Sequence, residues 1–131
     1  MYMKYTKEQV LAVILYNIAA ADGNVTTEER DQISELASSL KDFDTNGIKN
    51  AFANTEIIKL PIGEIVDSIN PEDKSKYIYA CCKIVTSDKL VSFSELICLH
   101  KIAEMLEIPA YLVSYYMAKV IQEYPEISFE D

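Results

Sequence analysis

The chain has 131 residues, half of them hydrophobic, and a formal net charge of −9 at pH 7. This length and apolar content suffice for one hydrophobic core, whereas three glycines and four prolines are too few for the turns of a β-sandwich or barrel. The acidic balance disfavours binding to nucleic acid or to an anionic membrane surface, because both need clustered Lys and Arg.

The first predicted helix spans residues 9–21 and is apolar nearly all round, which is typical of the centre of a helical bundle. Thr6 and Gln9 have the spacing of a capping box at its start. The apolar run also resembles a secretory signal, but Glu8 and Asn17 interrupt that pattern. The run is too short to span a bilayer. We therefore expect a buried helix and no membrane insertion.

The next predicted helix begins at a second capping box, Thr26-x-x-Glu29, just after Asp22. In such a box the hydroxyl accepts from the amide of the Glu, and the carboxylate accepts from the amide of the cap residue. Apolar residues then recur at helical spacing, which predicts one buried stripe. They are Ile33, Leu36, Ala37 and Leu40.

The middle of the chain is less regular and predicts shorter elements. One helix is expected from residue 44 or 45 to 52 and another from 61 to 69. A long apolar helix follows over residues 76–87, and Asn70 followed by Pro71 is typical of a helix start before it.

The last part of the chain predicts two more helices. Ser92-x-x-Glu95 is a third capping box, and apolar residues follow it as far as Leu106. Pro109 suits the first turn of the final helix, whose expected apolar face is Tyr111, Leu112, Tyr115, Tyr116, Val120 and Ile121. We expect one domain over residues 1–131, with residues 125–131 as a frayed acidic tail.

Residues 19–40 align with residues 85–106 at a constant offset of 66. The aligned pairs include Asp22 and Asp88, Val25 and Val91, Thr26 and Ser92, Glu29 and Glu95, and Leu40 and Leu106. Because all of these matches share one offset, they indicate a duplicated helical unit. The fold class that follows is all-α, a single bundle of about six to seven helices made of two related halves.

Asp22 and Asp88 are the residues that capping explains least. Each ends a long apolar helix, where its charge meets the negative end of the helix dipole and where Gly or a cation is preferred. One interpretation is a hydrogen bond from turn amides to the Asp carboxylate, which is common. The other is that each Asp binds a divalent cation together with Glu29, Glu95 or nearby oxygens.

Other chemistries have weaker support in the sequence. The first loop is not an EF-hand, because Thr27 stands where such a loop requires glycine. Cys98 and His100 are two residues apart on a predicted helix and face different sides, so they do not make a zinc pair. Cys81 and Cys82 are adjacent and indicate buried thiols in a reduced, cytoplasmic protein. No phosphate loop or nucleophile motif occurs.

The two aligned loops resemble those of the TerB (tellurite resistance) family, the first through AADGNVTTEE at residues 20–29 and the second, more weakly, through residues 87–95. The resemblance covers most of residues 7–107. It implies an all-helical domain, metal binding through clustered acidic residues, and a role in stress response or the cell envelope. Carried over, the acidic positions are Asp22, Glu29, Asp88 and Glu95. Lys89 departs from the pattern and partly neutralises Asp88.

We therefore expect a non-enzymatic helical interaction module that weakly binds a divalent cation at its acidic loops. A protein partner or a second copy of the chain is the expected partner, and nucleic acid is not. The alternative is a purely structural or oligomeric domain in which the four acidic residues serve as helix caps. The spatial separation of the two loops distinguishes a shared site from two independent caps.

Overall fold

The computed structural model describes residues 5–86, 90–123 and 128–129, with the backbone alone at Asp22, Leu90 and Val91 and in the last of these segments. Within these ranges the chain forms eight α-helices. Six are longer: α1 (Lys7–Ala19), α2 (Thr27–Ser38), α3 (Thr45–Ala53), α6 (Lys74–Val85), α7 (Phe93–Met105) and α8 (Ala110–Glu123). Two are single turns, α4 (Thr55–Ile58) and α5 (Ile62–Ile65). The predicted all-α fold is confirmed.

Short connecting elements complete the described chain. Three 3-10 helices occur, η1 (Ala20–Asp22), η2 (Val66–Ser68) and η3 (Pro71–Asp73). Two strands of two residues each, β1 (Leu90–Val91) and β2 (Ser128–Phe129), pair in parallel. The predicted frayed tail lies outside the described residues except for β2. The extent of the domain over residues 1–131 stays a prediction.

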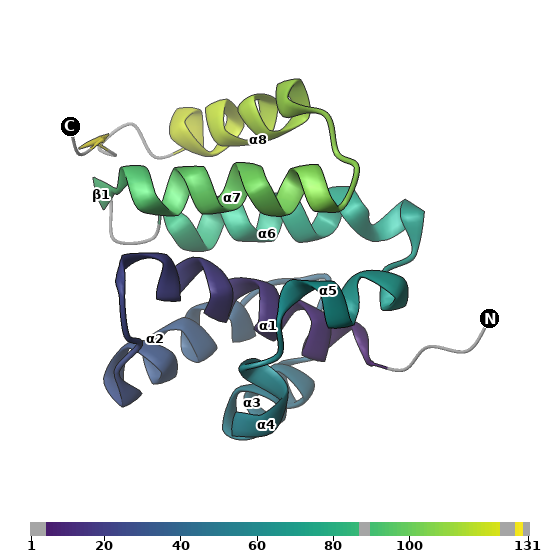
Figure 1. The fold of residues 1–131 in the computed structure, drawn as a ribbon. Helices are drawn as coiled ribbons and strands as arrows, with labels where there is room; N and C mark the ends of the chain where they lie inside the picture. Colours follow the sequence, from purple (N-terminus) through teal and green to yellow (C-terminus); the bar gives the residue numbers. More distant parts are fainter. Residues whose placement is uncertain (1–4, 87–89, 124–127, 130–131) are drawn as a thin grey trace.

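Helix α1 lies in the middle of the molecule (Figure 1). It contacts α6 and α7 on one side and α3 and α4 on the other, and α2 packs against α3. Helix α8 covers the outer side of α6 and α7. No helix in the described ranges combines the length and the apolar character needed to cross a membrane.

The central position of α1 follows from its sequence. Its six consecutive residues Val10–Leu15 are all at most 2% exposed, so every face of this helix is covered. Asn17 is the polar exception, and its side-chain amide donates to the carbonyl oxygens of Val13 at 2.8 Å and of Leu60 at 3.3 Å. These bonds compensate for the loss of water around the amide. The predicted buried helix is confirmed.

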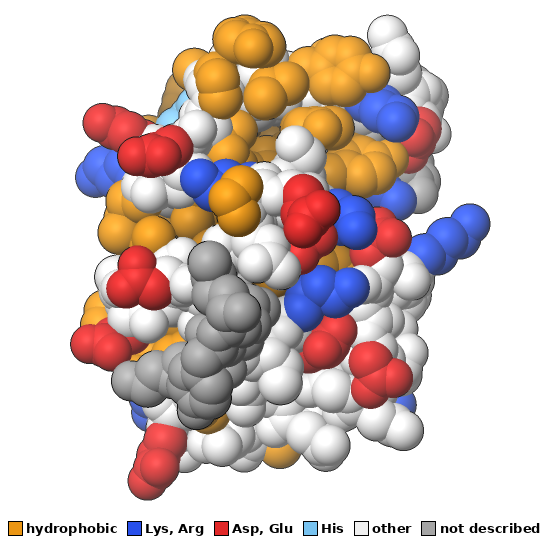
Figure 2. Space-filling model, turned by 90° about the vertical axis from the view of Figure 1, so that its right-hand side faces the viewer, with side chains coloured by type: hydrophobic (Ala, Val, Ile, Leu, Met, Phe, Trp, Pro, Cys, Tyr) orange, Lys and Arg blue, Asp and Glu red, His pale blue; other side chains and the backbone are white. Residues whose placement is uncertain are grey.

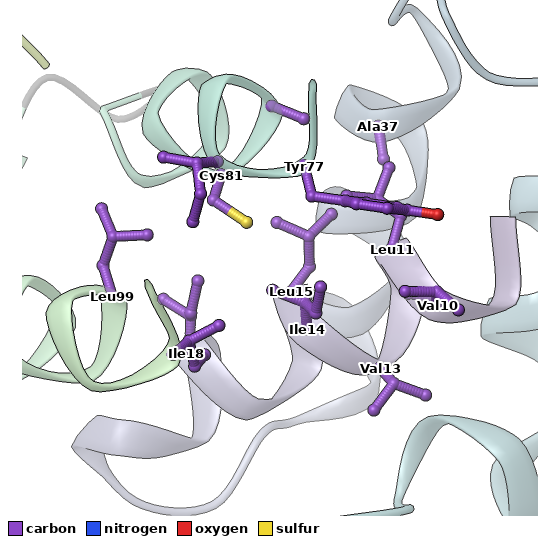
Figure 3. Close-up of a cluster of buried hydrophobic side chains, with 14 of the residues drawn as sticks. Val10, Leu11, Val13, Ile14, Leu15, Ile18, Ala37, Tyr77, Cys81 and Leu99 are labelled. Atoms are coloured by element: carbon purple, nitrogen blue, oxygen red, sulfur yellow. The ribbon is translucent and has the colours of Figure 1, made fainter. Parts of the chain in front are cut away.

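Helix α6 supplies the second side of the core. Tyr77, Ile78, Cys81 and Cys82 are each at most 1% exposed. Figure 3 shows Cys81 of α6 and Leu99 of α7 directed toward the labelled side chains of α1. Because this helix is buried on several faces, its sequence is apolar without a clear stripe.

One local prediction differs from the structure, and one short helix was not predicted. The helix expected over residues 61–69 divides into α5 and η2, and the one-turn α4 is an addition. Asn54 starts α4, because its side-chain oxygen accepts from the amides of Glu56 and Ile57. Asn70 precedes η3, whose first residue is Pro71 as predicted, and η3 leads into α6; the Asn70 side chain makes no capping bond.

The predicted apolar face of α8 is also wrong in part. Its buried residues are Val113, Met117 and Val120, which follow one another at helical spacing. Tyr111 and Tyr115 are instead 71% and 58% exposed. The expected face included the tyrosines because their rings are largely apolar, whereas the packing of α8 buries Val113, Met117 and Val120 instead.

Candidate functional site, an acidic pocket between two helix starts

Helices α2 and α7 begin with the same hydrogen-bonded arrangement. The hydroxyl of Thr26 accepts from the Glu29 amide at 3.1 Å, and the Thr26 amide donates to Glu29 Oε1 at 3.2 Å. The corresponding distances at Ser92 and Glu95 are also 3.1 and 3.2 Å. In addition, the Ser92 hydroxyl donates a hydrogen bond to Glu95 Oε1 at 2.9 Å. Both predicted capping boxes are confirmed, and the duplication of two halves stays a prediction.

The two capping glutamates line one pocket of about 370 Å³. Glu29 enters it from the start of α2 and Glu95 from the start of α7. Its apolar wall comes from the end of α1 and the end of α6, through Leu15, Ile18, Ile84 and Val85. Four helices thus bring together two carboxylates that lie in different parts of the sequence.

Asn24 and Gln32 add side-chain amides to the same pocket. Gln32 was not predicted from the sequence, whereas Asn24 stands two residues after Asp22, at the spacing of the first two side-chain ligands of a calcium loop. Gln32 follows Glu29 by three residues on α2, and residues at this spacing share a helix face. That spacing was the available signal for Gln32.

The side chains of the two aspartates lie outside the described part of the chain. Asp22 is the last residue of η1, and its side chain lies outside the described atoms. Asp88 lies outside the described residues altogether. The predictions of metal ligation for Asp22 and Asp88 therefore stay predictions.

The donor types at the pocket suit a hard cation. Carboxylate and amide oxygens are ligands of Ca²⁺ and Mg²⁺, whereas Zn²⁺ in proteins is held mainly by His and Cys. Over the described ranges, no group of three or more His, Cys, Asp and Glu residues is placed to hold a metal ion. Among the described residues, Glu29 and Glu95 thus provide the two carboxylates of this pocket.

The three cysteines are free thiols away from the pocket lining. Burial raises the pKa of the Cys82 thiol to about 12 and that of Cys81 well above its ordinary value. The pKa of Cys98 is raised by burial as well, with Lys101 acting in the opposite direction. The Cys98 thiol donates to the Asn17 carbonyl oxygen at 3.6 Å. Such neutral thiols are poor nucleophiles and metal ligands.

These features define an all-helical domain with a small acidic pocket between two capped helices. Residues 8–113 match the family model described as Tellurite resistance protein TerB. This match covers well over half of the chain, which belongs to the TerB family, as the two loops predicted. Comparisons with curated proteins and with solved structures gave no match.

Proposed function

We propose that this TerB-family chain is a non-enzymatic, cytoplasmic interaction module that weakly binds a divalent cation at the acidic pocket. Glu29 and Glu95 are the two ligands from the described residues, and Asp22 and Asp88 are the further ligands. A role in stress response agrees with the family. The observation that carries the proposal is that Glu29 and Glu95 line one pocket.

Two carboxylates around one small volume repel each other, and a divalent cation relieves that repulsion. Each carboxylate uses Oε1 to accept its cap amide, and a carboxylate has enough lone pairs to accept a second bond or a cation. Few charged ligands correspond to weak Ca²⁺ sites, with a Kd of about 10⁻⁴ to 10⁻³ M.

The test uses the Glu29→Gln/Glu95→Gln double variant, which removes both charges but keeps both caps. Gln is known to cap in this chain, because Gln9 accepts the Thr6 amide at 3.0 Å in the same geometry. Thermal unfolding is followed with CaCl₂, MgCl₂ and ZnCl₂ and with a chelator. A tenfold excess over Kd would stabilise the wild type by about 1.4 kcal/mol, or about 4 °C in Tm.

The matched control is Glu28→Gln/Glu104→Gln, which removes the same charge at two exposed positions outside the pocket. We expect Ca²⁺ or Mg²⁺ to raise the Tm of the wild type and of the control, and not that of the pocket variant. The Asp22→Asn/Asp88→Asn variant then reports whether the aspartates contribute. An equal rise in all four proteins would remove the cation from the proposal and leave the structural alternative, in which these glutamates are caps.

The interaction part of the proposal rests on a different face. The large exposed hydrophobic residues of the described chain lie on α7 and α8, and they are Phe93, Ile97, Met105, Tyr111 and Tyr115. Figure 2 shows hydrophobic side chains gathered at the level of α8. Such grouping is typical of protein–protein contact. Sedimentation velocity of the wild type and of Tyr111→Ser/Tyr115→Ser tests self-association, and a concentration-independent monomer for both would exclude a homo-oligomer.

A further inference from the structure

A second and larger pocket, of about 590 Å³, lies next to the acidic pocket. Leu36 of α2 and Ile84 of α6 line both pockets and separate them. The larger pocket is bounded by the end of α2, the loop that follows it and one side of α6. Its volume is within the range of small-molecule sites, about 300 to 1,000 Å³.

The charge of this pocket is opposite to that of the chain as a whole. Lys41, Lys76 and Lys83 line it, and Asp42 is the one acid among the lining residues. The whole chain carries −9. A local excess of positive charge in an acidic protein creates an attractive field for anions at that position.

The three lysines of the pocket differ in the partners that they contact within the described part of the chain. Lys76 Nζ lies 3.5 Å from Asp73 Oδ1. Lys83 Nζ lies over the Tyr79 ring, 4.6 Å from its centroid, and such a contact orients an ammonium without neutralising it. Neither Lys41 nor Lys83 forms an ion pair with a described residue. Two ammonium groups therefore keep their charge for a ligand.

Apolar residues also line the pocket, with Leu40, Phe43, Ala80 and Ile84 beside the aromatic ring of Tyr79, and Ser39 and Thr86 add two hydroxyls. Inorganic phosphate would leave these side chains without contacts, and a neutral hydrocarbon would leave the ammonium groups unused. We propose that this pocket binds a small amphipathic anion, with one carboxylate or phosphate head on an apolar body. The head lies by Lys41 and Lys83, and the body packs against Leu40, Phe43 and Ile84.

The test compares two dyes that share an apolar body. 8-Anilinonaphthalene-1-sulfonate has an anionic head, and N-phenyl-1-naphthylamine lacks it. We expect the sulfonate to bind at least tenfold more tightly, as measured by fluorescence titration. In the Lys41→Gln/Lys83→Gln variant its affinity should fall about tenfold, with little change for the neutral dye.

The control is Lys49→Gln/Lys59→Gln, which makes the same change in net charge at exposed lysines outside the pocket. Its affinity for the sulfonate should stay within twofold of the wild type, and Tm checks the fold of each variant. Competition by octanoate identifies a carboxylate head, and competition by octyl phosphate identifies a phosphate head. Equal affinity in both lysine variants, equal competition by octanol, or loss of binding in Tyr111→Ser on the exposed α8 face would each overturn the proposal.

Discussion

Glu29 and Glu95 are 66 residues apart in the chain, and both line the pocket between the starts of α2 and α7. Each glutamate accepts the amide of its own cap residue at the same distance of 3.2 Å. Local hydrogen bonding and tertiary packing thus act on the same two side chains. The cap orients each carboxylate, and the packing of α1 and α6 beneath them places both glutamates on the lining of one pocket.

The capping boxes lead to a first prediction about stability. Thr26→Ala and Ser92→Ala each remove the hydroxyl that accepts an N-terminal amide, so each should lower the free energy of unfolding by about 1 kcal/mol. Thr27→Ala is the matched control, because Thr27 is exposed and lies one residue inside α2. Urea denaturation measures all three. A loss at Thr27 as large as at Thr26 would contradict a specific capping role.

Glu107 provides a second prediction, because its φ is +59°, in the left-handed region that favours glycine. It ends α7 in a Schellman motif, in which the Ile108 amide donates to the Ala103 carbonyl at 2.8 Å and the Glu107 amide to that of Glu104. Its ion pair with Lys74, at 4.0 Å, is solvent-exposed and contributes little. Glu107→Gly should therefore raise stability by about 0.5–1 kcal/mol.

The control for that substitution is Glu104→Gly, one turn earlier in the helical part of α7. It should instead lower stability by about 1 kcal/mol, because glycine is a poor helix former. Thermal and urea unfolding of both variants measure whether each substitution raises or lowers the free energy of unfolding. A loss of stability in Glu107→Gly would show that the left-handed residue is not under strain.

Gly23 leads to a third prediction. It follows η1 with φ at +131°, which an L-residue adopts only with strain, although nothing lies within 4 Å of an added Cβ. Gly23→Ala should therefore lower stability by about 1 kcal/mol or more through backbone conformation alone. Gly63→Ala is the matched control, since Gly63 lies in α5 and also has open space. Its substitution should be neutral or stabilising, and the same loss at both positions would contradict the argument.

The buried thiols lead to a prediction about pH. Burial raises the pKa values of Cys81 and Cys82 in the folded protein above the ordinary value of 9.0. The folded state therefore keeps protons that the unfolded chain releases above about pH 9, so the free energy of unfolding falls as pH rises. Each thiol contributes a slope of up to about 1.4 kcal/mol per pH unit, which for Cys82 continues to about pH 12.

Urea unfolding at pH 8, 9 and 10 measures this slope. The Cys81→Ala/Cys82→Ala variant removes the two thiols and keeps the other titrating groups, so its stability should decline less steeply than that of the wild type. Thiol labelling is the second measurement. Half-buried Cys98 should react before the other two, and parallel slopes together with equal labelling rates would contradict the assignment.

The sequence predicted those features that depend on near neighbours along the chain. The capping residues Thr6, Thr26 and Ser92 lie where the patterns placed them, because a capping box needs only residues three apart. The buried helix α1 was predicted for a related reason, since a run without a polar face has to be covered on all sides. The TerB family followed from the loop at residues 20–29, which is local as well.

Features that depend on how the helices pack were missed or left open. The exposed positions of Tyr111 and Tyr115 depend on which side of α8 faces α6, and an apolar residue by itself fits either side. The lysines of the larger pocket lie on a loop and on α6 and share no sequence pattern. The caps and the central helix were predictable from the sequence, because hydrogen bonds and apolar periodicity act within a few residues. That Glu29 and Glu95 line one pocket emerged from the fold, because it depends on how the helices between them pack together.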